Sequence, residues 1–101
     1  MIVINATITA DAETITAMTD AIIKMEKASL EEDGCQEYSW AVAISDGSQM
    51  RITERWDNIE ALIAHFSMPH MAEFQAAMAA NPSKDTEIHC YEATEIPFPA
   101  M

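Results

Sequence analysis

Alternating apolar and polar residues predict four strands. In residues 2–9 every second side chain is apolar, which is typical of a strand with one buried face. Residues 35–45, 49–56 and 86–93 are predicted as the other strands. Asp46-Gly47 lies between the second and third strands and predicts a tight hairpin turn. The apolar positions of the first strand are Ile2, Ile4, Ala6 and Ile8.

The segment between the first two strands is predicted to be a helix. Apolar residues recur there at steps of three and four, at Ile15, Met18, Ile22, Met25 and Ala28. Asp11 is the expected N-terminal cap, and Gly34 is expected to end the helical region.

Two shorter helices are predicted between the third and fourth strands. Asp57 and Glu60 have the spacing of a capping box, so a helix is expected from there to about Phe66. Pro69 suits the first turn of the next helix, and Asn81-Pro82 ends it. In the first of these helices we expect Ile59, Leu62, Ile63 and Phe66 to be buried.

The order of these elements predicts the fold class. Strand, helix, two strands, a helix pair and a final strand make the ferredoxin-like, split βαβ arrangement of α+β proteins. The helices would cover one face of the sheet. We expect the other face to be apolar as well, from Val3, Cys35, Ala41 and Ala43. A second copy of the chain would cover it, so a homodimer is predicted.

Composition narrows the class of protein. The 101 residues include 5 lysines and arginines and 17 aspartates and glutamates, giving a net charge of −12. This length suits one domain over residues 1–101, with residues 96–101 as an apolar, proline-containing tail. The acidic charge disfavours nucleic acid and anionic membranes as partners. The first residues lack the pattern of a signal peptide, so a cytoplasmic location is expected, with Cys35 and Cys90 buried and reduced.

Four short stretches resemble a known family. They are Glu32-Asp33-Gly34-Cys35 with Tyr38, then Glu54-Arg55-Trp56, Ala64-His65-Phe66, and Pro69-His70-Met71 with Phe74. Over roughly residues 2–95 the chain is similar to the antibiotic biosynthesis monooxygenase family, and most of all to its small quinol monooxygenases. The resemblance implies a homodimeric α+β barrel. In several members it also implies an oxygenation that uses neither metal nor flavin.

Two branches of the family fit less well. The haem-degrading relatives use an asparagine that Asn5 matches, but their tryptophan falls on His65 and their haem-ligating histidine on Gln75. Glutamine is a poor axial ligand, so we expect no haem. In the polyketide-tailoring branch, Trp56 matches the tryptophan, whereas Ile52 and Leu62 replace its neighbouring polar residues.

Oxygenation without a cofactor needs a base, a hydrogen-bond partner and a dry pocket. Histidine suits the base, and we assign this role to His65, with packing as the alternative reading. Asn5 is the candidate partner of a bound oxygen, or else it bonds a neighbouring strand. Trp56, His70, Tyr38 and Phe74 are candidate substrate-binding residues. Trp56 has two readings, because strand alternation points it at the helices and the resemblance points it at a cavity.

No metal site is expected from the sequence. His65 and His70 are five residues apart with a break between them, so a shared helical face cannot be assumed. A zinc or iron site needs three or four converging ligands. The predicted function is a cofactor-independent monooxygenase acting on a small phenolic or quinol-type substrate. The alternative is a non-catalytic dimeric barrel that binds or senses a small aromatic molecule.

Overall fold

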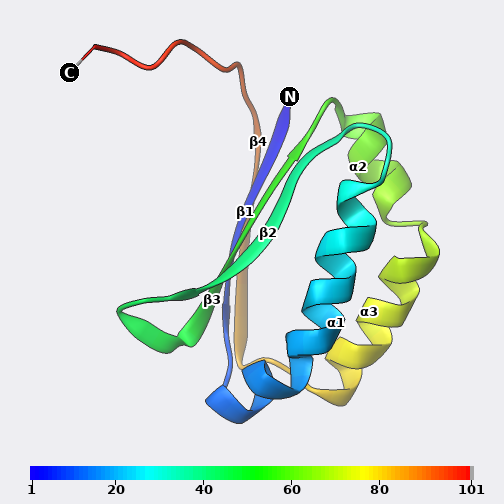
Figure 1. Ribbon diagram of the computed structural model, residues 1–101, viewed down its shortest axis with the longest axis vertical. Helices are drawn as coiled ribbons and strands as arrows, with labels where there is room; N and C mark the ends of the chain where they lie inside the picture. The colour runs from blue at the N-terminus through cyan, green and yellow to red at the C-terminus, as the bar shows by residue number, and fades with distance from the viewer. Residues whose placement is uncertain (101) are drawn as a thin grey trace.

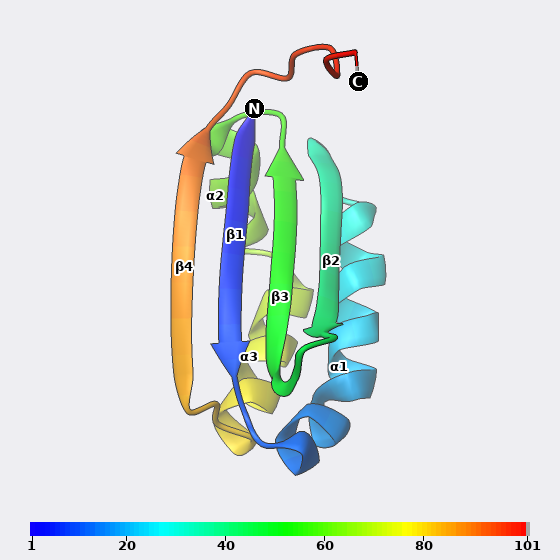
Figure 2. The same cartoon turned by 90° about the vertical axis from the view of Figure 1, so that its left-hand side faces the viewer.

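The computed structural model describes residues 1–100 and contains one antiparallel sheet with three helices on one face (Figure 1). In chain order the elements are β1 (Ile2–Thr9), α1 (Ala12–Leu30), β2 (Cys35–Ala43), β3 (Asp46–Trp56), α2 (Ile59–His65), α3 (Pro69–Ala80) and β4 (Asp85–Glu92). The strand order is β2-β3-β1-β4, and Figure 2 shows the open face of the sheet with the helices behind it. This is the ferredoxin-like α+β fold predicted from the sequence.

The chain ends in a segment that leaves the body of the protein. Residues 93–100 form no helix or strand and extend away from the end of β4 (Figure 1). The predicted apolar tail begins at Ile96, and its last residue, Met101, lies outside the described residues. Among the residues described, no helix combines the length and apolarity needed to cross a membrane.

The strand register decides which side chains face the helices. Ile4 pairs with Glu54 on one side and Cys90 on the other, so these three residues share the helix-covered face. The core lies between this face and the helices. Its buried apolar residues are Ile2, Ile4, Ala6, Ile8, Met18, Ile22, Met25, Tyr38, Met50, Ile52, Trp56, Leu62 and Phe74.

The open face of the sheet is mostly polar, so the expectation of an apolar face was wrong. Cys35 packs against the core instead, because a bulge between Cys35 and Glu37 shifts the register of β2. Val3, Ala41 and Tyr91 are apolar exceptions on the open face. The polar residues there are Asn5, Thr7, Thr9, Glu37, Ser39, Gln49, Arg51, Thr53, Arg55, Asp85, Glu87 and His89.

The β2–β3 hairpin turns earlier than predicted. Its two turn residues are Ile44 and Ser45, and Ala43 pairs with Asp46 at the start of β3. Gly47 does not have the positive φ that a type I′ turn needs. The Asp46 carboxylate instead accepts hydrogen bonds from the backbone N–H and the hydroxyl of Ser48, at 3.0 and 2.6 Å. These bonds hold the first residues of β3.

Helix α2 is capped by Asn58 and not by the predicted Asp57–Glu60 box. The Asn58 side chain accepts a 2.9 Å hydrogen bond from the backbone N–H of Ala61. The Asp57 carboxylate accepts a 2.8 Å bond from the Gln36 side chain, which ties the start of α2 to β2.

The buried side of α2 also differs from the prediction. Leu62 and His65, three residues apart, are the buried residues of this helix. Ile59, Ile63 and Phe66 are 43–59% exposed. Helix α2 therefore turns the side that carries Leu62 and His65 toward the interior and leaves the Ile59–Ile63 side partly exposed.

Gly34 sets the sharp turn between α1 and β2. Its φ is +83°, in the left-handed region that glycine adopts without strain. A Cβ at this position would lie 2.7 Å from the Cβ of Ala61 on α2. The turn therefore rests directly on α2, and it brings Glu32 next to that helix.

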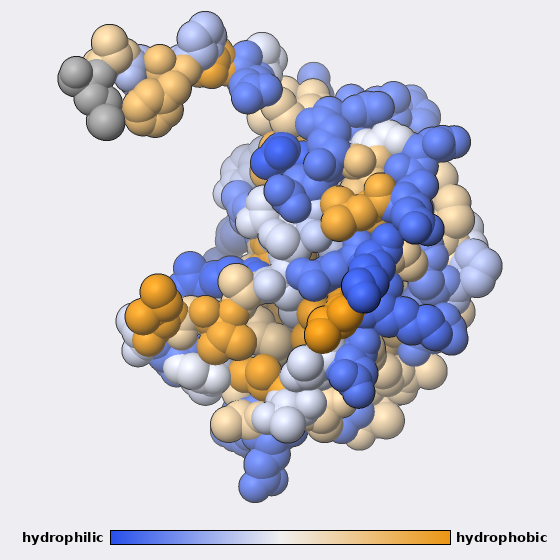
Figure 3. Space-filling view, in the orientation of Figure 1, coloured by the Kyte–Doolittle hydropathy of each residue, from blue (hydrophilic) through white to orange (hydrophobic). Residues whose placement is uncertain are grey.

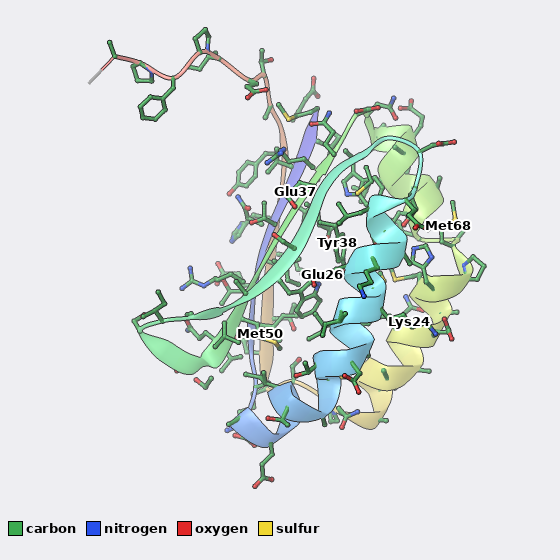
Figure 4. All side chains as sticks on the ribbon, viewed as in Figure 1. Lys24, Glu26, Glu37, Tyr38, Met50 and Met68 are labelled. Carbon is green, nitrogen blue, oxygen red and sulfur yellow. The ribbon has the colours of Figure 1, made fainter. Side chains whose placement is uncertain are left out.

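Edge strand β2 is tied to α1 through Glu26. The Glu26 carboxylate accepts a 2.8 Å hydrogen bond from the backbone N–H of Trp40. This satisfies a donor that an edge strand would otherwise leave unpaired. Figure 4 shows Tyr38 and Glu26 between β2 and α1, whereas Glu37 lies on the other side of the strand.

Both cysteines are free, and only Cys35 is partly buried. Burial raises the pKa of the Cys35 thiol to about 11, with further contributions from the negative charges of Glu32 and Glu54. Cys90 is exposed, so the expectation that it is buried was wrong. It faces the helix side of β4, but the helices do not reach over this edge strand, which is exposed along its whole length.

Candidate active site

A large cavity lies between the sheet and helices α1 and α3. Its volume is about 560 Å³, within the range of pockets that hold small organic ligands. Its lining includes Thr86 and Ile88 of the exposed strand β4. Apolar side chains make up most of the wall, and five of them are methionines, namely Met18, Met25, Met50, Met71 and Met78.

Glu54 is the one charged side chain among the residues that line this cavity. It lies on β3 and faces the helices. Its Oε1 accepts a 3.0 Å hydrogen bond from the indole Nε1 of Trp56. Burial raises the pKa of the Glu54 carboxyl, and the negative charge of Glu32 adds to this; the Trp56 hydrogen bond and His65 act in the opposite direction. A carboxylate with a raised pKa at an apolar cavity is suited to general base chemistry.

Two aromatic side chains define the inner wall. Trp40 lines the cavity and packs edge-on against Phe74, with ring centroids 5.5 Å apart. The Trp40 indole N–H donates a 3.3 Å hydrogen bond to the hydroxyl of Tyr38. Tyr38 is buried, and burial raises the pKa of its hydroxyl, so it stays protonated at neutral pH.

A second polar group lies beyond Trp56, where α1, α2 and α3 come together. Oε2 of Glu32 is 2.6 Å from Nδ1 of His65 and 2.7 Å from Nε2 of His70. The His65 ring also lies 4.7 Å from the ring of Trp56. The expectation that no three ligands converge was therefore wrong, because these three residues could hold a metal ion.

The structure separates the residues assigned from the sequence. Phe74 lines the large cavity, and His70 lines a smaller hollow of about 200 Å³ between α1 and α3. Trp56 is fully buried on the helix-covered face, which settles its two readings in favour of strand alternation. His65 is 1% exposed and lies in the interior, not at a cavity mouth. Trp56, His65 and Tyr38 are not among the residues that line the large cavity.

Asn5 lies on the other side of the sheet from this cavity. It is exposed and pairs with Thr53 and His89, both on the open face. A hydrogen bond from Asn5 to a ligand would require that ligand to bind on the open face.

Two site residues were not assigned from the sequence. Glu54 carried a signal, because it is a charged residue in line with Ile52 and Trp56 on an apolar strand face. Glu32 belongs to a stretch that carries the family resemblance, but its place in a run of three acidic residues is typical of a solvated turn. Only the Gly34 turn and the packing of α2 show that it is buried.

Comparisons with known proteins give the family. The sequence profile of the antibiotic biosynthesis monooxygenase family matches residues 1–77, which is most of the chain. The chain belongs to this family. No curated protein matches it significantly. Membership in the antibiotic biosynthesis monooxygenase family supports a monooxygenase-like function, and it leaves the substrate open because the fold hosts several activities.

Solved structures agree with this assignment. A candidate antibiotic biosynthesis monooxygenase from Deinococcus radiodurans is 28% identical, with full coverage of both chains and a TM-score of 0.89. A candidate family member from Nitrosomonas europaea is 14% identical over 94% of this chain and 100% of its own, with a TM-score of 0.86. A Bacteroides thetaiotaomicron protein described as a possible oxidoreductase is 22% identical over 91% and 96%, with a TM-score of 0.82. The last two show the shared fold alone.

Proposed function

We propose that this protein is a cofactor-independent monooxygenase that binds a small phenolic or quinol-type substrate in the 560 Å³ cavity. The observation that carries the proposal is the position of Glu54, the single carboxylate in an otherwise largely apolar cavity. A phenol or hydroquinone fits this chemistry, since it offers a flat apolar body and one or two acidic O–H groups.

Glu54 acts as the general base in this proposal. Ionised Glu54 accepts the phenolic proton, and the resulting phenolate is far easier to oxidise than the phenol. Because the pKa of Glu54 is raised, it lies closer to the pKa of the phenol, and this favours proton transfer to Glu54. The assignment of His65 as the base stays a prediction. Its ring lies behind Trp56, so Glu54 is the better placed of the two residues.

The substrate supplies all the electrons for oxygen reduction. One hydroquinone and one O₂ give one hydroxyquinone and one water. The ring loses four electrons, one oxygen atom enters the product and the other leaves as water. The reaction therefore balances without an external reductant, and the protein needs to provide only a base and an apolar pocket that excludes water.

The cavity wall also bears on the choice of substrate. Methionine side chains are flexible and polarizable, so they adapt to ligands of different outline. Trp40 and Phe74 offer aromatic surfaces on the inner wall for a bound ring. This wall favours a family of substituted aromatic rings over one tightly matched compound.

The proposed active form is a homodimer. Apolar side chains are exposed at the tip of the β2–β3 hairpin and along the tail, where Figure 3 shows hydrophobic surface. They are Val42, Ile44, Ile96 and Phe98, and a partner subunit would cover them. Sedimentation at micromolar concentration should give about twice the chain mass of 11.2 kDa. A folded monomer would contradict the dimer but leave the cavity chemistry untouched.

Oxygen uptake with a panel of hydroquinones and phenols tests the function. Trp40 lines the cavity, so the combined fluorescence of Trp40 and Trp56 reports binding in the same samples. If the protein is an enzyme, a bound substrate quenches the fluorescence and one O₂ is consumed per substrate molecule. Quenching with no oxygen uptake across the panel would favour the alternative, a non-catalytic barrel that binds or senses aromatic molecules.

A further inference from the structure

We propose that Glu32, His65 and His70 form a binding site for one divalent transition-metal ion, with Zn²⁺ as the probe that identifies it. Each residue offers one ligand atom, and these atoms lie within 4.8 Å of one another. Two imidazoles and one carboxylate are a donor set that suits zinc and its neighbours in the first transition row. Calcium and magnesium prefer oxygen ligands alone.

The three residues come from separate segments that the fold brings together. Glu32 lies in the turn after α1, His65 is the last residue of α2, and His70 is in the first turn of α3. The side chains are 5%, 2% and 16% exposed, respectively. Chance surface clusters of acidic residues are solvated, whereas this cluster is buried and contains two imidazoles.

The contacts of Glu32 with the two imidazoles are shorter than the ligand spacing of a metal-bound site. In a tetrahedral site with bonds of about 2.0–2.1 Å, ligand atoms are about 3.3 Å apart. The two contacts of Glu32 Oε2, at 2.6 and 2.7 Å, would need to open by about 0.6 Å. The two ring nitrogens, which lie within 4.8 Å of each other, would take up the same spacing, so binding requires the three side chains to rotate around the ion. Metal binding requires the tautomer of each imidazole that leaves a lone pair on Nδ1 of His65 and on Nε2 of His70, facing the ion.

Local charge favours a cation at this place. Among the described residues, no lysine or arginine forms an ion pair with Glu32, so its buried charge has only the two imidazoles as partners. Glu54, the second buried carboxylate in this part of the core, feels the negative charge of Glu32. A dication would offset both charges in a medium of low dielectric constant.

The surroundings supply a shell and an entrance. The rings of Tyr38, Trp56 and Phe66 lie 4.7–6.0 Å from the His65 ring and shield it. His70 opens onto the 200 Å³ hollow between α1 and α3, through which an ion and a fourth, water ligand can enter. The Lys24 ammonium at this hollow is paired with Glu73 at 3.1 Å.

This site is distinct from the proposed reaction cavity. Glu32, His65 and His70 are not among the residues that line the cavity, whereas they connect the α1–β2 turn to α2 and α3. The ion would therefore act on the stability of the helical layer and on the charge near Glu54, but no step of the proposed oxygenation takes place on it.

Calorimetric titration of chelator-treated protein with Zn²⁺ tests the site. We expect one ion per chain and a melting temperature raised by more than about 5 °C at a hundredfold excess over Kd. His70→Gln should weaken binding more than tenfold, since loss of even an outer-shell partner of a metal site costs about 10–100-fold. His89→Gln is the matched control, because His89 contacts Glu87 at 2.8 Å but both side chains are exposed. It should bind as the wild type does.

X-ray absorption on the wild-type zinc complex gives a readout that depends on no variant. Nitrogen and oxygen neighbours at about 2.0–2.2 Å, including two imidazoles, would support the site. A sulfur neighbour at about 2.3 Å would place the ion at a cysteine and overturn it. The proposal would also be overturned if the protein bound no zinc, or if His70→Gln and His89→Gln lost zinc affinity to the same extent. None of these measurements involves turnover, so they are independent of the proposed function.

Discussion

Glu54 and Trp56 lie two residues apart on the same face of β3, and the indole N–H of Trp56 donates a 3.0 Å hydrogen bond to the Glu54 carboxylate. The pair joins the core to the cavity, since Trp56 is fully buried and Glu54 lines the wall. The bond holds Glu54 in one orientation and favours its ionised form. Trp56 is thus a positioning residue for the proposed base.

Replacing Trp56 by Phe should therefore alter the pH dependence of the reaction. Without the N–H donor, the pKa of Glu54 rises further above its usual value, because this bond is the largest effect that lowers it. The acidic limb of the kcat profile should move to higher pH. Stability should fall by about 1–3 kcal/mol through the smaller ring and the lost bond. An unmoved acidic limb in a folded Trp56→Phe enzyme would show that Glu54 is not the titrating group.

Replacing Glu54 by Gln should stabilise the protein at neutral pH. A carboxyl whose pKa is raised in the folded state binds its proton more tightly there than in the unfolded chain. The protonated carboxyl therefore stabilises the folded state below about pH 4.5, the ordinary pKa of a glutamate. This stabilisation is lost as the pH rises through the raised pKa. Urea midpoints should therefore favour Glu54→Gln increasingly as the pH rises from 4.5 through the raised pKa, and by a constant amount above it. A constant difference between variant and wild type across that range would contradict the burial of an ionisable Glu54.

Gly34 and Gly47 offer a matched pair for the α1–β2 turn. Gly34→Ala places a Cβ 2.7 Å from Ala61 at a φ of +83°, so we expect a loss of about 1–3 kcal/mol in the free energy of unfolding. Gly47→Ala meets no atom within 4 Å and should change stability by less than about 0.5 kcal/mol. Equal effects in urea unfolding would mean that the turn does not rest on α2 as described.

The fold was predictable because its apolar periods are local. The first strand and the Met18–Met25 stripe of α1 carry their period in adjacent residues, and the structure keeps both. The failures lie where one residue shifts the register. A single position separates the predicted cap at Asp57 from the observed one at Asn58, and the buried side of α2 carries His65 where Ile59, Ile63 and Phe66 were expected. The bulge in β2 moved Cys35 to the other face in the same way.

The site was predictable only in part. Phe74 was assigned from the family resemblance and lines the cavity. The contact of Glu32 with two imidazoles depends on the Gly34 turn and the packing of three helices, and residues 33 and 38 positions apart share no local pattern. The polar open face was misjudged because a few apolar side chains were taken to represent a face that also carries Arg51 and Arg55.

Steady-state oxygen uptake by Glu54→Gln tests the central claim most directly. The measurement uses whichever hydroquinone the wild type oxidises, and calorimetric titration without oxygen confirms that the variant still binds it. Glu87→Gln, on an exposed strand position, is the control and should match the wild type. Loss of a general base should lower kcat by about 10²–10⁴-fold with binding retained. A Glu54→Gln enzyme that binds the hydroquinone and consumes oxygen at the wild-type rate would contradict the assignment of Glu54 as the base in this cavity.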